Sequence, residues 1–86
     1  MSTKLLRQIK NSIPDLRKSE KIVGEFILED PKSVLTMKTA EASEAMGISE
    51  PTLIRFCKAI GFSGFQELKI NLSQQLAADD YFVMYE

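Results

Sequence analysis

Apolar residues recur along most of the chain at steps of three and four, which is the spacing of one face of an α-helix. This spacing predicts a first helix in which Leu5, Leu6, Ile9 and Ile13 share one face and which Pro14 ends. It predicts a second helix over about residues 18–29, ended because the residue before Pro31 is disfavoured in helical geometry. The residues expected to face inward on the second helix are Ile22, Val23, Phe26 and Ile27. The next stretch, KSVLTM, predicts a short turn or a single helical turn opened by Ser33.

Two glycines divide the middle of the chain into two further helices. An alanine-rich helix is predicted from Thr39 up to Gly47, a residue suited to the left-handed conformation that follows many helices. Ser49 is predicted to cap the next helix, with Pro51 in its first turn, where proline is tolerated. That helix is expected to end at Gly61.

The C-terminal third predicts one more helix and a tail. Ser63 and Gln66 have the spacing of a capping box, in which the serine caps a helix and the glutamine is its third residue. The apolar residues that repeat along this helix are Phe65, Leu68, Leu72 and Leu76. Residues 79–86 depart from the pattern, so we expect a domain over residues 1–78 followed by a tail or linker over 79–86. With no strand signal and only short connections, the predicted fold class is all-α, a compact bundle of five to six short helices.

Composition limits the chemistry that this chain can perform. It has 86 residues, 44% of them hydrophobic and 27% charged, the balance of one small soluble domain. It lacks histidine and has a single cysteine, Cys57, which excludes an internal disulfide, the usual zinc sites and a Ser/His/Asp or Cys/His centre. All carboxylates are expected on solvated faces or at helix caps. We therefore predict no catalytic residue, no metal, no cofactor and no enzymatic activity, and expect Cys57 to be a small buried packing residue.

Charge and hydropathy bear on location and partners. No apolar stretch is long enough to span a membrane, and the N-terminus is charged within four residues, so a cytoplasmic protein is expected. The net charge of −1 argues against a generic polyanion binder. Basic residues are nevertheless concentrated at one end: residues 1–38 hold eight Lys and Arg against five acids, whereas residues 61–86 hold one lysine against four acids.

Residues 39–58 have the pattern of a homeodomain-like helix-turn-helix. Ala42 and Ser43 are small residues where two helices must approach, and Gly47 lies at the turn. The residues expected to pack the two helices together are Met46, Ile48, Leu53 and Phe56. Those left facing outward are Ser49, Glu50, Pro51, Thr52, Ile54, Arg55 and Lys58. An exposed helix with these side chains fits the major groove of DNA.

The segment SEPTLIRFCKAIGFSGFQELK, residues 49–69, resembles the N-terminal helix-turn-helix domain of RpiR-type transcriptional regulators. LRKSEKIVGEFILEDPKSVLTM, residues 16–37, is similar to the second helix of that domain and the turn after it, so the resemblance covers about residues 3–78. It implies a dimeric bacterial regulator of sugar catabolism with a C-terminal sugar-isomerase-type domain that senses phosphosugars. That domain is absent from these residues. The chain also departs from the family pattern at Arg17, Lys18 and Ala42.

Carried onto this sequence, the resemblance implies a set of DNA-contacting residues. The candidates for reading bases are Ser49, Glu50, Thr52 and Arg55, and those for phosphate contact are Lys58 and Lys38. Glu50 has an alternative role, because an acid in the first turn also complements the helix dipole. Arg55 has one as well, which is to pair with Glu50 or Glu67 on the surface.

The expected partner is double-stranded DNA with a palindromic operator, bound by a homodimer of this protein. No membrane partner is expected. The apolar residues expected to hold two copies together are Leu5, Leu6 and Ile9 of the first helix and the tail from Tyr81 to Tyr85. A phosphosugar effector would act only through the absent domain. The alternative function is a helical protein-interaction module, in which the face formed by residues 53–65 and the apolar tail dock a partner chain.

Overall fold

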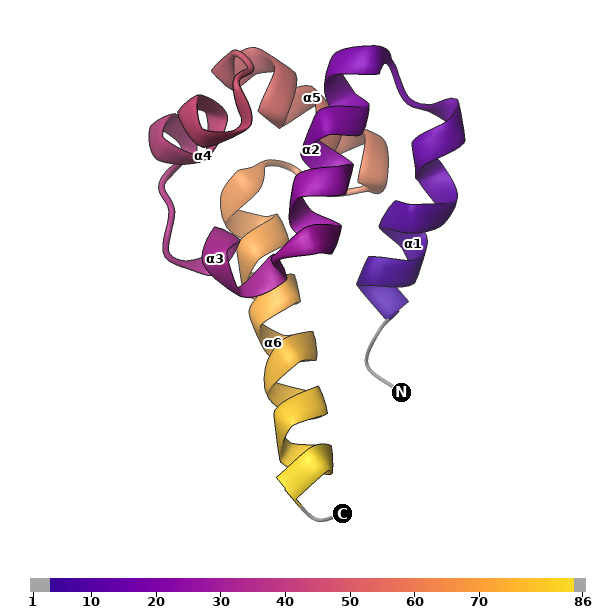
Figure 1. Ribbon diagram of the computed structural model, residues 1–86, viewed down its shortest axis with the longest axis vertical. Coiled ribbons are helices and arrows are strands. Elements are labelled where there is room, and N and C mark those ends of the chain that lie inside the picture. Colours follow the sequence, from indigo (N-terminus) through magenta and orange to yellow (C-terminus); the bar gives the residue numbers. More distant parts are fainter. Residues whose placement is uncertain (1–3, 85–86) are drawn as a thin grey trace.

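The computed structural model describes the backbone of residues 4–84 and the side chains of residues 4–77. Within that range the chain is all-helical and contains no strand, which confirms the predicted fold class. In chain order the elements are α1 (Lys4–Ser12), the 3-10 turn η1 (Ile13–Asp15), α2 (Lys18–Glu29), α3 (Pro31–Leu35), α4 (Thr39–Met46), α5 (Glu50–Ile60) and α6 (Phe65–Met84). Figure 1 shows α1 to α5 gathered at one end of α6, which packs against α1, α3 and α5 and then extends beyond them. The principal dimensions are 40 × 25 × 21 Å.

The hydrophobic core is built around α5, which contacts α1, α2, α4 and α6. Phe56 of α5 and Phe65 of α6 are the largest of the fully buried side chains. The buried apolar residues around them come from all six α-helices: Leu5, Ile9, Val23, Ile27, Val34, Ala42, Met46, Leu53, Cys57, Ile60, Leu68 and Leu72. Because α5 is surrounded on several sides, only one face of it is left for solvent.

The buried face of α2 differs from the predicted one. Ile22, expected inside, is 39% exposed, and Phe26 is only partly buried. The residues that α2 buries are Glu20, Val23, Gly24 and Ile27. Gly24 allows a close helix approach, since a Cβ atom built there would lie 3.2 Å from Cγ1 of Ile13. Val23 and Ile27 are buried as predicted, but hydrophobicity alone missed the other two members of the stripe because one is an acid and the other a glycine.

Two predicted helix starts need correction. α3 begins at Pro31 rather than at Ser33, whose hydroxyl donates a hydrogen bond to the Asp30 carbonyl at 2.9 Å. At α6 the capping partner is Glu67 and not Gln66: Oε1 of Glu67 accepts from the Ser63 backbone N–H at 2.7 Å and from the Ser63 hydroxyl at 2.9 Å. The N–H and hydroxyl donors of Ser63 lower the pKa of the Glu67 carboxyl.

α6 then continues without a break through residue 78, where the sequence placed the end of the domain.

The first helix packs into the monomer instead of presenting an apolar face. Leu5 and Ile9 are buried in the core, and Leu6 is half-buried, so the prediction that these residues form a dimer surface is wrong. The backbone N–H of Leu5 donates to Oε1 of Gln75 on α6 at 2.7 Å, which satisfies a free donor at the start of α1. The side chains of the other predicted dimer segment, Tyr81 to Tyr85, lie outside the described residues.

Cys57 is fully buried, as the sequence predicted, and burial raises the pKa of its thiol to about 12. The thiolate is the form that attacks a disulfide reagent, and it is scarce in the folded protein at neutral pH. We expect Cys57 to resist an aromatic disulfide reagent in the native protein and to react fully once the chain is unfolded in urea. Rapid reaction of the native protein would contradict the buried position of this side chain.

Candidate nucleic-acid interface

The turn between α4 and α5 is closed by backbone hydrogen bonds that require a glycine. Gly47 has φ +74°, in the left-handed region that side chains with a Cβ atom rarely adopt. Its N–H donates to the Glu44 carbonyl at 3.1 Å, and the Ile48 N–H donates to the Ser43 carbonyl at 3.0 Å. These bonds satisfy the last carbonyls of α4 and direct the chain into α5.

α5 begins as the sequence predicted. Ser49 has an extended backbone, and its Oγ accepts from the backbone N–H of Thr52 at 3.2 Å. Glu50 and Pro51 occupy the first turn, where a missing N–H costs nothing. The cap fixes the direction in which the first turn of α5 points.

α4 and α5 pack through the residues predicted for that contact. Ala42 and Ser43 are buried on α4, together with Met46. Leu53 and Phe56 are buried on α5, and Ile48 in the turn packs partly against the core. The Ser43 hydroxyl is satisfied within α4, where it donates to the Ala40 carbonyl at 3.0 Å.

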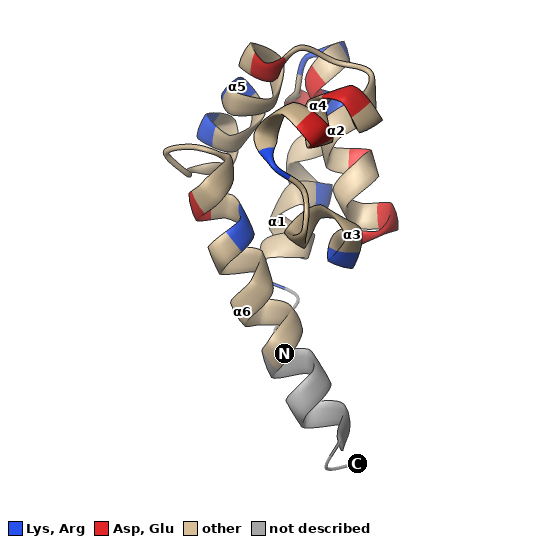
Figure 2. Cartoon of the chain, turned by 90° about the vertical axis from the view of Figure 1, so that its left-hand side faces the viewer, with Lys and Arg blue, Asp and Glu red and all other residues tan. Residues whose placement is uncertain are grey.

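The outward face of α5 carries the exposed residues Glu50, Pro51, Arg55 and Lys58, and the cap Ser49 just before the helix is exposed as well. Ile54 is half-buried beside them. Lys38 is also exposed, immediately before the first residue of α4. Figure 2 shows basic segments along α5 after the acidic Glu50 in its first turn, and further acidic segments where α4 and α2 lie. The structure thus places five of the six predicted site residues in solvent, three of them on the outer face of α5 and one at its cap.

Thr52 is the sixth predicted site residue, and its predicted outward position is wrong. It is only 6% exposed, in line with the buried Phe56 one turn later on α5. Its hydroxyl lies 2.9 Å from the Ser49 hydroxyl, close enough for a hydrogen bond, and its Oγ1 accepts from Nη2 of Arg55 at 3.1 Å. Thr52 therefore contacts two of the exposed candidates from beneath and does not face solvent itself.

Arg55 has a partner that the sequence did not suggest. Its Nε lies 3.6 Å from Oε2 of Glu20 on α2, and neither Glu50 nor Glu67 is its partner. The Glu20 side chain is only 9% exposed, which corrects the expectation that all carboxylates lie on solvated surfaces, whereas the Arg55 side chain is 52% exposed. A sequence signal for Glu20 did exist, because it lies three and seven residues before Val23 and Ile27, on the stripe that α2 buries.

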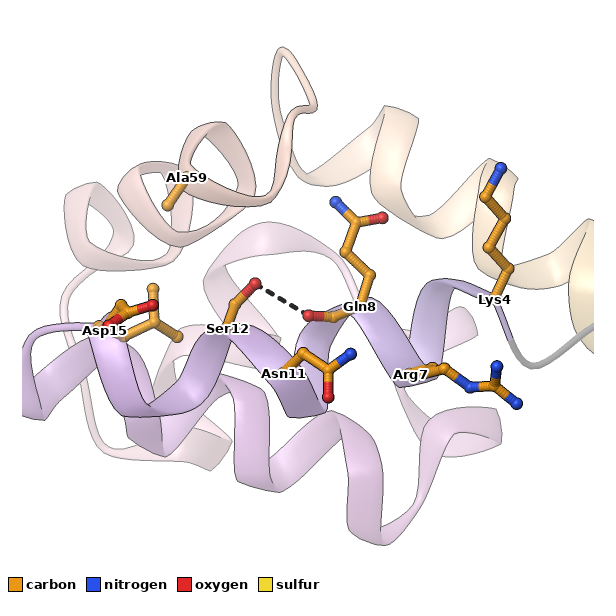
Figure 3. A pocket seen from close by; sticks show the side chains of 8 residues that line it. Lys4, Arg7, Gln8, Asn11, Ser12, Asp15 and Ala59 are labelled. Carbon is orange, nitrogen blue, oxygen red and sulfur yellow. Dashed lines mark hydrogen bonds between the residues drawn. The ribbon is translucent and has the colours of Figure 1, made fainter.

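A polar groove of about 630 Å³ lies between α1 and the last turn of α5, apart from the outward face just described. Figure 3 shows Gln8 and Ser12 on one side of it and Ala59 on the other. The Ser12 hydroxyl donates to the Gln8 carbonyl at 2.8 Å, and the Gln8 side chain donates to the Ile60 carbonyl at 2.7 Å. Asp15 is the one carboxylate in its lining, so the groove does not hold the paired acids of a hydrolytic centre.

Two further observations concern the described residues as a whole. No group of three or more His, Cys, Asp or Glu side chains in this part of the chain comes close enough together to hold a metal ion. None of its helices has the length and apolar character needed to cross a bilayer.

The geometry of α4 and α5 agrees with what comparison with known proteins shows. Residues 3–79 match the helix-turn-helix domain of the rpiR family. The chain belongs to that family. The sequence resemblance is thereby confirmed over nearly the whole domain.

Relatives of this rpiR-family domain include transcriptional regulators. The chain is 43% identical over 79 residues to the HTH-type transcriptional regulator HexR of Pseudomonas aeruginosa, covering 92% of this chain and 28% of that protein. It is 36% identical over 73 residues to HexR of Escherichia coli, covering 85% of this chain and 25% of that protein. The chain therefore spans about a quarter of the length of these relatives.

Two solved structures share the fold of the rpiR-family domain. The N-terminal domain of the putative regulator YbbH from Bacillus subtilis is 32% identical with a TM-score of 0.80, and the match covers 85% of this chain and 89% of that one. NanR of Vibrio vulnificus, solved in complex with ManNAc-6P, has a TM-score of 0.84 at 24% identity, over 92% of this chain and 30% of that one. This second likeness concerns the fold alone.

Proposed function

We propose that this domain binds double-stranded DNA sequence-specifically through the outward face of α5, as the DNA-binding part of a bacterial transcriptional regulator of carbohydrate metabolism. One observation carries the proposal: α5 packs against four other helices, yet Arg55 on its outward face stays half exposed. The major groove of DNA is wide enough to admit an α-helix, and side chains on a free polar face can then reach the base edges. Such a protein would work in the cytoplasm, beside the chromosome.

Each exposed side chain has a role that its chemistry suits. Arg55 can donate to O6 and N7 of guanine, and Ser49 can donate to a base edge or a phosphate. Glu50 either accepts from cytosine N4 or only complements the positive end of α5. Lys58 and Lys38 are exposed and are the candidates for phosphate contact. Arg17 and Lys18, exposed just before Glu20, are additional candidates for that contact.

The regulatory role extends beyond this chain. The relatives are several times longer than the matched region, and NanR was solved with ManNAc-6P. We infer that a sugar phosphate controls DNA binding through a part of the protein outside these residues. One recognition helix reads too few base pairs for a unique genomic site, so two copies are expected on half-sites about 34 Å apart.

Selection of binding sites from a pool of random duplexes tests the proposal directly. We expect enrichment of a palindromic motif whose halves are one helical turn apart. Recovery of a random pool after several rounds would contradict sequence-specific binding, and a single unrepeated half-site would contradict binding as a pair.

A salt series separates DNA binding from the alternative, a helical module that docks a partner protein. Phosphate contacts release counterions, so affinity for the selected duplex should fall steeply as salt is raised. Lys58→Ala should weaken binding to all duplexes alike and reduce the slope of log affinity against log salt by about one unit. Glu44→Gln, an exposed change on α4, is the control and should leave the slope unchanged. An affinity insensitive to salt would favour the docking module.

A further inference from the structure

Glu20 is an acid in a place that normally holds an apolar side chain. It lies on the buried stripe of α2, and its side chain is 9% exposed. Burying a carboxylate is costly unless a partner compensates for the lost water. The partner in the structure is the guanidinium of Arg55, 35 residues away in sequence, on the helix proposed to read DNA. This pair joins α2 to the candidate interface.

Arg55 is held at two points on one side of its guanidinium. Nε lies 3.6 Å from Oε2 of Glu20, and Nη2 donates to Oγ1 of Thr52 at 3.1 Å. Thr52 is fixed in turn, because it is buried and its hydroxyl pairs with that of Ser49, the cap of α5. Arginine has five N–H donors in a planar fork, so these contacts leave other donors of the terminal nitrogens for an acceptor outside the protein.

We propose that Glu20 and Thr52 are positioning residues that orient Arg55 for base recognition before DNA arrives. The proposal rests on the proposed function and adds two residues that determine specificity without touching DNA. Immobilising a long side chain on binding reduces affinity. Because Arg55 is already ordered in the folded protein, little of that loss remains when DNA binds. The Glu20 carboxylate also offsets the charge of the Arg55 that it holds, so this arginine attracts phosphates of any sequence less strongly. Both effects favour the correct base pair over DNA in general.

The test compares Glu20→Gln and Thr52→Val with the wild-type chain on the duplex selected above and on its single-base variants. We expect each change to lower discrimination by about 2- to 12-fold, the cost of ordering one long side chain. The loss should be confined to the base pair at which Arg55→Ala also loses its preference. A residue that only stabilises the fold would weaken binding at every position alike.

Matched controls come from the same helices. Glu25→Gln removes an exposed acid from α2, and Thr52→Ser keeps the hydroxyl, so both should retain wild-type discrimination. In an Arg55→Ala background, Glu20→Gln should have no further effect on discrimination, because its effect acts through Arg55. Circular dichroism checks that each variant is folded. If Glu20→Gln fails to fold, Thr52→Val and Thr52→Ser decide the question.

Three results would overturn the proposal. The first is unchanged discrimination in a folded Glu20→Gln or Thr52→Val variant. The second is an equal loss with and without Arg55, and the third is unfolding of both variants, which would make the contacts purely structural. If the wild-type chain selects no sequence at all, the proposed function fails as well, and that result is distinct from the other three.

Discussion

Phe56→Ala is expected to lower the free energy of unfolding by about 3 to 5 kcal/mol, because it removes a large fully buried side chain and leaves a cavity. A domain of this size has a total stability of about 5 to 13 kcal/mol. The change therefore removes a large fraction of it. Urea denaturation followed by circular dichroism measures the difference.

The matched control for this prediction is Ile70→Ala on α6. Ile70 is a large apolar residue that is 51% exposed, so its truncation should change stability by less than about 0.5 kcal/mol. A denaturation curve of Phe56→Ala that overlays the wild type would show that Phe56 faces solvent. α5 would then be rotated, and the assignment of its outward face would fail with it.

Arg55→Ala is expected to reduce affinity for the selected duplex by about 5- to 150-fold, the value of a good bidentate base contact. Affinity for an unrelated duplex should change much less. Because the change leaves Glu20 without its partner, some loss of stability is also expected. Titration of the selected and unrelated duplexes at one salt concentration gives the ratio of the two affinities, which measures specificity.

Arg55→Lys separates recognition from stability. It keeps a positive charge near Glu20 but lacks the planar fork, so we expect it to melt closer to the wild type while still losing discrimination. Wild-type selectivity in both variants would show that Arg55 does not read bases, and that α5 contacts DNA through other residues or not at all.

Helix ends were predictable from sequence because their signals are local. Pro14 and Pro31 restrict the backbone on their own, and Gly47 and Gly61 adopt positive φ values that favour glycine. Ser49 needs only a residue three positions later to form its cap. The failures at the start of α6 were small, since Glu67 stands beside the expected Gln66.

The burial of Glu20 and Thr52 had a signal in the helical spacing, but the ion pair of Glu20 did not. Glu20 is stabilised by a residue on another helix, and no local pattern reveals that contact. Thr52 was predicted outside because it is polar, yet it lies four residues before Phe56 on the buried stripe of α5. Exposure of Ser49, Glu50, Arg55 and Lys58 agrees with the predicted interface, but their contacts with DNA stay predictions.

The hydrogen bond between Leu5 and Gln75 has a consequence for how the domain is made. It joins residues 70 positions apart, so it closes a loop of almost the entire domain. Closing a long loop costs entropy, which is offset only once the contact between its ends has formed. The ribosome synthesises the chain from its N-terminus. The first turn of α1 is therefore synthesised early, but it gains this hydrogen bond only after Gln75 has left the ribosome.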